Sequence, residues 1–220
     1  MFVGDYMENK LFSKVFLWMF LGLALTFGVA YYLYLNPTMM ANLFSGSKIY
    51  IIFILEILTV IIFGVRIRKM SVMSARILFL FYSFLTGLTV SAIFVLYPIS
   101  SIIYVFLITS ILFLIFGLIG YFTKIDLSKL GTILFMGLVG IILCSIINIF
   151  IKSESFDLVT TIIAVIIFLG YIAFDINKIK RNYINFEDSD KLAIYGALEL
   201  YLDFINLFLR LLSLFGNRRD

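Results

Sequence analysis

Two aspartates, Asp175 and Asp203, lie within long apolar stretches of the sequence. A carboxylate at the centre of a bilayer costs about 2.5–3.5 kcal/mol on insertion scales, so it needs a proton, a cation or water as a partner. Two neighbouring carboxylates in a low-dielectric site do not easily both ionise, and they share one proton. We interpret the two as an ion or proton site. Alternatively, Asp175 alone is an interface residue stabilised by Asn177 and Lys178.

Asp203 belongs to a series of polar residues at helical spacing. The polar line, as we call it, consists of Tyr195, Glu199, Asp203, Asn206 and Arg210. Spacings of three and four residues place all five on one face of an α-helix. Such a face is expected to point into a helix bundle and not to lipid. The alternative is a structural hydrogen-bond ladder, but two acids and one base do not neutralise one another.

Possible countercharges lie on an earlier apolar run. Glu56 is about eight residues inside that run, and Arg66 and Arg68 stand at its end. An arginine within reach of Asp203 would hold it ionised and close a path until protons or a cation arrive. The alternatives are a hydrogen bond from Glu56 to a neighbouring helix, and arginines that anchor the chain at the membrane surface. The basic run from Lys178 to Arg181 is interpreted as another such anchor.

The composition indicates the environment in which these residues lie. Of 220 residues, 63% are hydrophobic and 14% are charged, and the mean hydropathy is +1.14. A soluble domain is about 45–50% apolar and about 25% charged, so we expect an integral membrane protein. There is no histidine, which excludes His-ligated metals and Ser-His catalysis, and the single Cys144 excludes an intrachain disulfide. No cofactor and no nucleic acid partner are expected, because the basic residues flank the apolar runs.

Apolar length predicts an all-α bundle of seven membrane-spanning helices in a single domain covering 1–220. One span needs about 20 apolar residues. Residues 77–123 carry no charge over twice that length, and Tyr97-Pro98 near the middle predicts a turn between two spans. Asn36-Pro37 ends the first span in the same way. The spans are expected at about 14–35, 48–66, 76–97, 99–122, 130–151, 157–176 and 192–215.

The basic residues and glycines add topology and packing. Twelve of the 17 Lys and Arg residues fall in the N-terminal segment and the loops on its side of the predicted array. This bias predicts a cytoplasmic N-terminus, and the short termini fit a prokaryotic cytoplasmic membrane. Glycine pairs at Gly117 and Gly120, and at Gly137 and Gly140, are expected to allow close helix packing.

Three segments resemble the transmembrane Bax inhibitor motif family: ALELYLDFINLFLRLLSLFG on the last predicted helix, FDINKIKRNY and GLTVSAIF. The resemblance implies a central seventh helix wrapped by two layers of three helices. It also implies a pH-sensitive calcium leak that is not an enzyme, gated by a di-aspartyl pair at Asp175 and Asp203, which would contact Ca²⁺ transiently. An arginine latch would fall on Arg66 or Arg68, with Arg66 preferred. The chain differs from bacterial relatives at Glu199, where a small polar residue is usual.

Other functions remain open from the sequence. A proton-coupled cation exchanger would use the same carboxylates, and a regulatory interaction protein would need the polar line only for structure. An intramembrane aspartyl protease resembles this pattern less, since that family carries Tyr-Asp, Gly-x-Gly-Asp and Pro-Ala-Leu elements. Here the aspartates follow Phe174 and Leu202, and the only prolines are Pro37 and Pro98. Lipid, calcium and protons are the expected partners.

Overall fold

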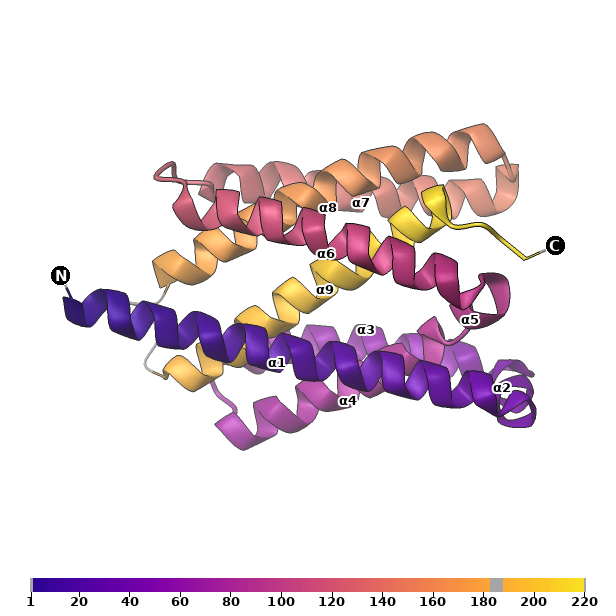
Figure 1. Ribbon diagram of the computed structural model, residues 1–220, viewed down its shortest axis with the longest axis horizontal. Helices are drawn as coiled ribbons and strands as arrows, with labels where there is room; N and C mark the ends of the chain where they lie inside the picture. Colours follow the sequence, from indigo (N-terminus) through magenta and orange to yellow (C-terminus); the bar gives the residue numbers. More distant parts are fainter. Residues whose placement is uncertain (1, 183–187, 220) are drawn as a thin grey trace. The chain divides into compact units, whose positions relative to one another are not determined.

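The computed structural model describes residues 2–182 and 188–219, and these residues are almost entirely α-helical (Figure 1). No strand occurs within them. The helices are α1 Phe2–Leu35, α2 Pro37–Phe44, α3 Lys48–Arg66, α4 Val72–Val90, α5 Ile93–Leu96, α6 Ile99–Phe122, α7 Ser128–Ile151, α8 Glu154–Asn182 and α9 Ser189–Phe215. The predicted all-α fold class is thus confirmed.

Within the described residues, seven helical segments are long and apolar enough to cross a membrane, as the sequence predicted. The predicted spans 48–66 and 99–122 coincide with α3 and α6. The short helices α2 and α5 were not expected, because proline was interpreted only as a helix end. Pro37 in fact occupies the first turn of α2, where its missing N–H leaves no hydrogen bond unmade.

Two helices extend well beyond their predicted bounds: α1 begins at Phe2 and not near 14, and α8 ends at Asn182 and not near 176. The last turn of α8 contains Lys180 and Arg181, and cations are favourable near the carbonyl end of a helix dipole. Asp175 therefore lies about two turns inside α8 and not at its end.

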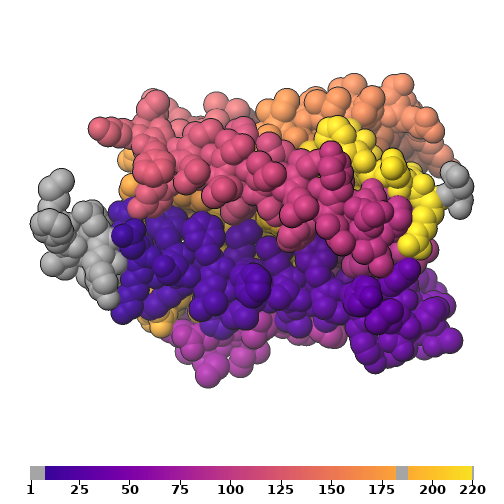
Figure 2. All heavy atoms as spheres, in the orientation of Figure 1, coloured from indigo at the N-terminus to yellow at the C-terminus, as the bar shows by residue number. Residues whose placement is uncertain are grey.

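The outer surfaces of the helices suit lipid. Along α6, whose outer face is in view in Figure 2, exposed apolar residues recur every three or four positions. They are Ile103, Tyr104, Leu107, Ile111 and Leu114. By contrast, 72% of the central window of α9 is buried, against 11% for α7. The central position of the last helix and the two layers of three helices around it remain predictions.

The chain divides into two compact units, and α9 contributes one half to each. Unit 1 contains α1 to α5, the first half of α9 through Tyr201, and the residues Arg218 and Arg219. Unit 2 contains α6 to α8 and the second half of α9 from Leu202. The expectation of one domain over 1–220 stays a prediction.

In unit 1, α4 packs against α1 and α3. Gly87 permits the close approach to α1, because a Cβ there would lie 2.8 Å from the backbone oxygen of Thr26. The fully buried Tyr201 of α9 then packs edge-on against Phe79 and Tyr82 of α4, with ring centroids 5.8 and 5.9 Å away.

In unit 2, α8 packs against α6 and α7. A Cβ at Gly120 would overlap the Ala173 carbonyl oxygen, and side chains of α8 are likewise close to Gly117 and Gly137. The expectation for Gly140 was wrong: nothing lies within 4 Å of a Cβ there. The α9 half of unit 2 is held by Phe204, whose ring centroid is 5.3 Å from that of Phe106.

Candidate functional site

Asp175 lies on the face of α8 that also carries Tyr171 and Lys178. The aspartate is 5% exposed, and its Oδ1 atom is 3.7 Å from the Nζ atom of Lys178. Tyr171 precedes it by four residues and Lys178 follows it by three, so one helical face aligns all three side chains. Asp175 therefore has a nearby cation that favours its charged form.

Asp203, on the unit 2 half of α9, is also 5% exposed. The Tyr171 hydroxyl lies within electrostatic range of both Asp175 and Asp203. Both predicted site residues thus interact electrostatically with one tyrosine of unit 2. Tyr171 was not among the predicted site residues, whereas Lys178 was predicted as a membrane anchor or as a neighbour that stabilises Asp175. Their spacing from Asp175 was the signal that could have identified them.

The polar line of α9 differs in part from its expected placement. Asp203 is buried, but Tyr195, Glu199, Asn206 and Arg210 are only half-buried. The most buried positions of α9 are apolar instead, including Leu200, Leu207 and Leu212. Apolar side chains gain most from burial. The line is therefore a half-buried strip along a mostly buried helix, with buried carboxylate oxygens on both Glu199 and Asp203.

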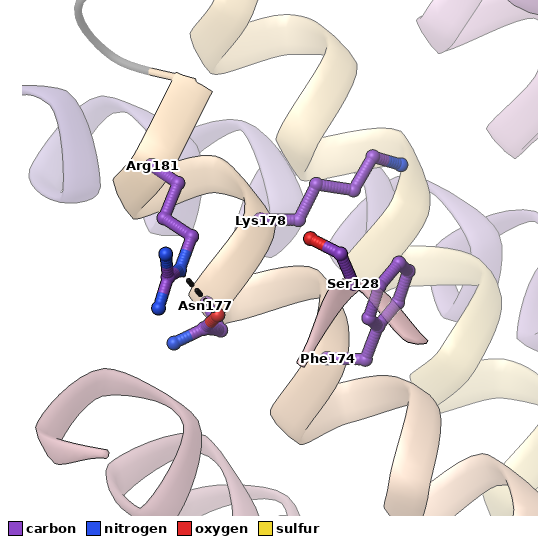
Figure 3. Close-up of a pocket in the computed structure, with 5 residues that line it drawn as sticks. All are labelled: Ser128, Phe174, Asn177, Lys178 and Arg181. Atoms are coloured by element: carbon purple, nitrogen blue, oxygen red, sulfur yellow. Dashed lines mark hydrogen bonds between the residues drawn. The ribbon is translucent and has the colours of Figure 1, made fainter. Parts of the chain in front are cut away.

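Close to the end of α8 lies a pocket of about 210 Å³, drawn in Figure 3. It is lined by Ser128, Phe174, Asn177, Lys178 and Arg181. Arg181 Nε donates to Asn177 Oδ1 at 3.0 Å, the dashed contact in Figure 3, and Asn177 Nδ2 donates to the Gly120 carbonyl at 3.3 Å. The hydrogen bonds connect the end of α8 to the end of α6.

Asp126 organises the connection between α6 and α7. Its Oδ1 accepts hydrogen bonds from the Ser128 hydroxyl at 2.6 Å and the Ser128 amide at 2.9 Å. These bonds, together with the charges of Arg181 and Lys129, hold the pKa of Asp126 below its usual range. Arg181 Nη1 lies 3.7 Å from Asp126 Oδ2. The arginine at the edge of the pocket thus already has a negatively charged neighbour.

Comparison with known proteins places these features in a family. The family model described as "Inhibitor of apoptosis-promoting Bax1" matches residues 8–220. The chain belongs to this Bax inhibitor family. The resemblance drawn from the last-helix motif is thereby confirmed, and so is an integral membrane protein with membrane-spanning helices.

Several bacterial relatives in the Bax inhibitor family match over nearly their whole length. The inner membrane protein YbhL of Escherichia coli strain K12 is 44% identical over 213 residues, covering 94% of this chain and 91% of the relative. A protein of Borreliella burgdorferi is 39% identical, covering 97% and 94%. A membrane protein of Streptococcus pyogenes serotype M1 is 37% identical, covering 97% and 95%.

Unit 1 of this Bax inhibitor family chain has its own polar cluster around Glu56. The Glu56 carboxylate accepts a hydrogen bond from Thr89 Oγ1 at 3.1 Å, so the expected alternative of a bond to a neighbouring helix is what the structure contains. Glu56 also interacts electrostatically with the hydroxyls of Tyr82 and Tyr201. Tyr201 in turn shares a 2.5 Å hydrogen bond with Thr26.

The two latch candidates stand at and just after the end of α3. Arg66 lies in the last turn of the helix and Arg68 follows it. Both side chains are exposed, and both residues belong to unit 1, whereas the aspartates belong to unit 2. The latch role stays a prediction for both arginines.

The two predicted metal ligands are the carboxylates of Asp175 and Asp203. Over residues 2–182 and 188–219, no group of three or more Asp, Glu or Cys side chains is placed to hold a metal ion. The pair offers two carboxylates, which are hard oxygen ligands suited to Ca²⁺.

Proposed function

We propose that this Bax inhibitor family protein is a passive, pH-sensitive Ca²⁺ leak gated by Asp175 and Asp203. One observation carries the proposal: two carboxylates, each 5% exposed, share the surroundings of Tyr171 inside candidate membrane spans. The sequence contains no histidine, so this pair is the best-placed group to respond to protons near neutrality.

The proposed mechanism follows from the charges around the pair. Two nearby carboxylates in a poorly solvated site favour a singly protonated state, whose proton is shared between them. The Lys178 ammonium, 3.7 Å from Asp175, favours ionisation of that member, so the shared proton resides preferentially on Asp203. Gain or loss of this proton changes the pair's net charge, and with it the barrier to a divalent cation.

A leak requires weak binding. A cation must bind well enough to enter but loosely enough to leave. Two carboxylates with water satisfy this better than the six to eight oxygens of a tight Ca²⁺ site. Arg66, or alternatively Arg68, would latch the pair in its closed state by pairing with an ionised carboxylate.

The proposed location is a prokaryotic cytoplasmic membrane with the N-terminus in the cytoplasm. The Escherichia coli relative, which is 44% identical, is named an inner membrane protein. The distribution of Lys and Arg residues supports the orientation. Tagging each terminus and measuring its accessibility in intact cells tests this orientation.

The central test is Ca²⁺ flux in proteoliposomes from about pH 5 to about pH 8. Asp203→Asn and Asp175→Asn are each expected to flatten the pH profile of flux. Asp157→Asn is the matched control, because Asp157 is an exposed residue in the first turn of the same helix as Asp175. An unchanged pH profile in both pair variants would refute the gate, and strict exchange of protons for Ca²⁺ would identify an exchanger instead.

A further inference from the structure

The end of unit 2 that holds the pocket carries an excess of positive charge. The α6–α7 connection and the last turns of α8 together contain five cations, Lys124, Lys129, Lys178, Lys180 and Arg181. Against them stand two carboxylates, Asp126 and Asp175. The Arg181–Asp126 ion pair joins the two segments within unit 2. This end of the unit therefore attracts anions.

The two pocket cations lie beside carboxylates at distances longer than that of a hydrogen-bonded ion pair. Lys178 lies 3.7 Å from Asp175, and Arg181 lies 3.7 Å from Asp126. A hydrogen-bonded ion pair is shorter, about 2.7–2.9 Å. The side chains of Lys178 and Arg181 are 30% and 43% exposed, so an anionic oxygen in the pocket can reach both. In Figure 3 they extend from α8 to opposite sides of the pocket.

The remaining pocket residues complete a phosphate-sized site. The polar lining is completed by Ser128, at the first turn of α7, whose hydroxyl donates to Asp126, and by Asn177, whose Nδ2 donates to the Gly120 carbonyl. Lys178 and Arg181 are therefore the main groups for an anion in the pocket. The volume of about 210 Å³ is several times the ~30 Å³ that one water occupies. Phe174, one turn deeper along α8 than Lys178, adds an apolar wall.

The position of the pocket indicates where the phosphate comes from. The candidate membrane span on α8 ends at Arg181, which is itself a pocket residue. Lipid headgroups lie at the ends of membrane spans, and basic pockets there recognise anionic headgroups. We propose that this pocket binds the phosphate of an anionic lipid headgroup, with Lys178 and Arg181 as its cationic ligands.

The site is coupled to the di-aspartyl pair through Lys178. A headgroup that draws the ammonium toward its phosphate weakens the attraction between Lys178 and Asp175. Anionic lipid then shifts the pH response of the pair toward higher pH, because Asp175 holds its proton more readily. This consequence rests on the proposed function, whereas headgroup binding does not.

Binding is tested on the full chain by native mass spectrometry, with phosphatidylglycerol titrated against phosphatidylcholine. Phosphatidylglycerol is expected to be retained preferentially, and Arg181→Gln is expected to weaken its binding about fivefold, as does the loss of one cation near a membrane surface. Arg181→Lys keeps the charge and should keep most of the binding. Lys152→Gln is the control, because it removes a charge at the opposite end of α7.

Equal retention of the two lipids, or wild-type binding by both Arg181→Gln and Lys178→Gln, overturns the proposal. A gel-filtration profile like that of wild type shows that each variant is folded. Inorganic phosphate, compared with chloride at equal ionic strength, separates the two possible sources of the anion. If phosphate alone raises the unfolding temperature of wild type but not of Arg181→Gln, the lipid source is wrong.

Coupling is tested by Ca²⁺ flux in vesicles of phosphatidylcholine with and without phosphatidylglycerol. The midpoint of the pH response is expected to rise with phosphatidylglycerol in wild type and Lys152→Gln, and to be independent of it in Lys178→Gln. If phosphatidylglycerol binds but the midpoint stays fixed, the coupling is wrong and the binding site stands. A failure of the Asp203→Asn flux test refutes the gate without affecting the binding result.

Discussion

Unit 1 and unit 2 each keep a carboxylate within an apolar helix, but they surround it differently. In unit 1, Glu56 accepts a hydrogen bond from Thr89 and lies near tyrosine hydroxyls. In unit 2, Asp175 has an ammonium at 3.7 Å and shares Tyr171 with a second carboxylate. Hydroxyl groups stabilise a carboxylate by polar interactions without adding a charge to the site. A second carboxylate and an ammonium, by contrast, make the net charge of the site depend on its protonation. The difference indicates a structural role for Glu56 and a sensing role for the pair.

The largest expected difference between the units is in the pH dependence of Ca²⁺ flux. The double variant Asp175→Asn and Asp203→Asn should lose this dependence, because neither remaining amide titrates. Glu56→Gln should keep the wild-type dependence, since its neighbours are hydroxyls. A pKa change of one unit corresponds to about a tenfold change in proton occupancy, so flux should differ by about that factor at one pH. A flat profile for Glu56→Gln would reverse the assignment of roles.

The second prediction compares helix packing in the two units by thermal unfolding in detergent. Gly87→Ala and Gly120→Ala should each destabilise the protein by about 1–3 kcal/mol, because the added methyl group meets backbone atoms of the facing helix. Gly140→Ala is the control: the space there is open, and alanine is favoured over glycine in a helix by about 1 kcal/mol. An unchanged unfolding temperature for Gly120→Ala would contradict the close contact of α6 with α8.

A smaller effect is expected from Thr89→Val, which removes the donor of the 3.1 Å hydrogen bond to Glu56. Loss of one such bond costs about 0.5–1.5 kcal/mol, so the unfolding temperature should fall slightly. The midpoint of the pH response of flux should not move, because Thr89 and Glu56 have no part in the proposed sensing. A shifted midpoint would show that Glu56 takes part in gating.

The smallest effect concerns Asp126, which lies outside the membrane spans and whose pKa is lowered by its Ser128 hydrogen bonds. A carboxyl with a lowered folded-state pKa stabilises the fold above its unfolded value, about 3.9, and loses that contribution as the pH falls through the folded value. Asp126→Asn should therefore unfold at a slightly lower temperature than wild type at neutral pH. The difference should vanish in strong acid. A constant difference down to low pH would assign the stabilisation to geometry and not to charge.

Much of this protein was determined by its sequence alone. Apolar runs of about twenty residues predict helices because lipid leaves the backbone no other hydrogen-bond partners. The predicted number of spans therefore agrees with the described structure. The predicted ranges 48–66 and 99–122 coincide with α3 and α6. The motif around Asp203 predicted the family, which the match over residues 8–220 confirmed. The helical repeat also placed the five residues of the polar line along one strip of α9.

Tertiary structure determined which groups surround Asp175 and Asp203. The burial of Asp175 and Asp203, the electrostatic interaction of Tyr171 with Asp203, and the pocket at the end of α8 all depend on contacts between segments far apart in the chain. Helical periodicity defines the face on which a residue lies but not the helix that covers it. Thus the sequence identified Lys178 as basic, near a membrane surface and one helical turn from Asp175. Only packing between helices gave it a pocket.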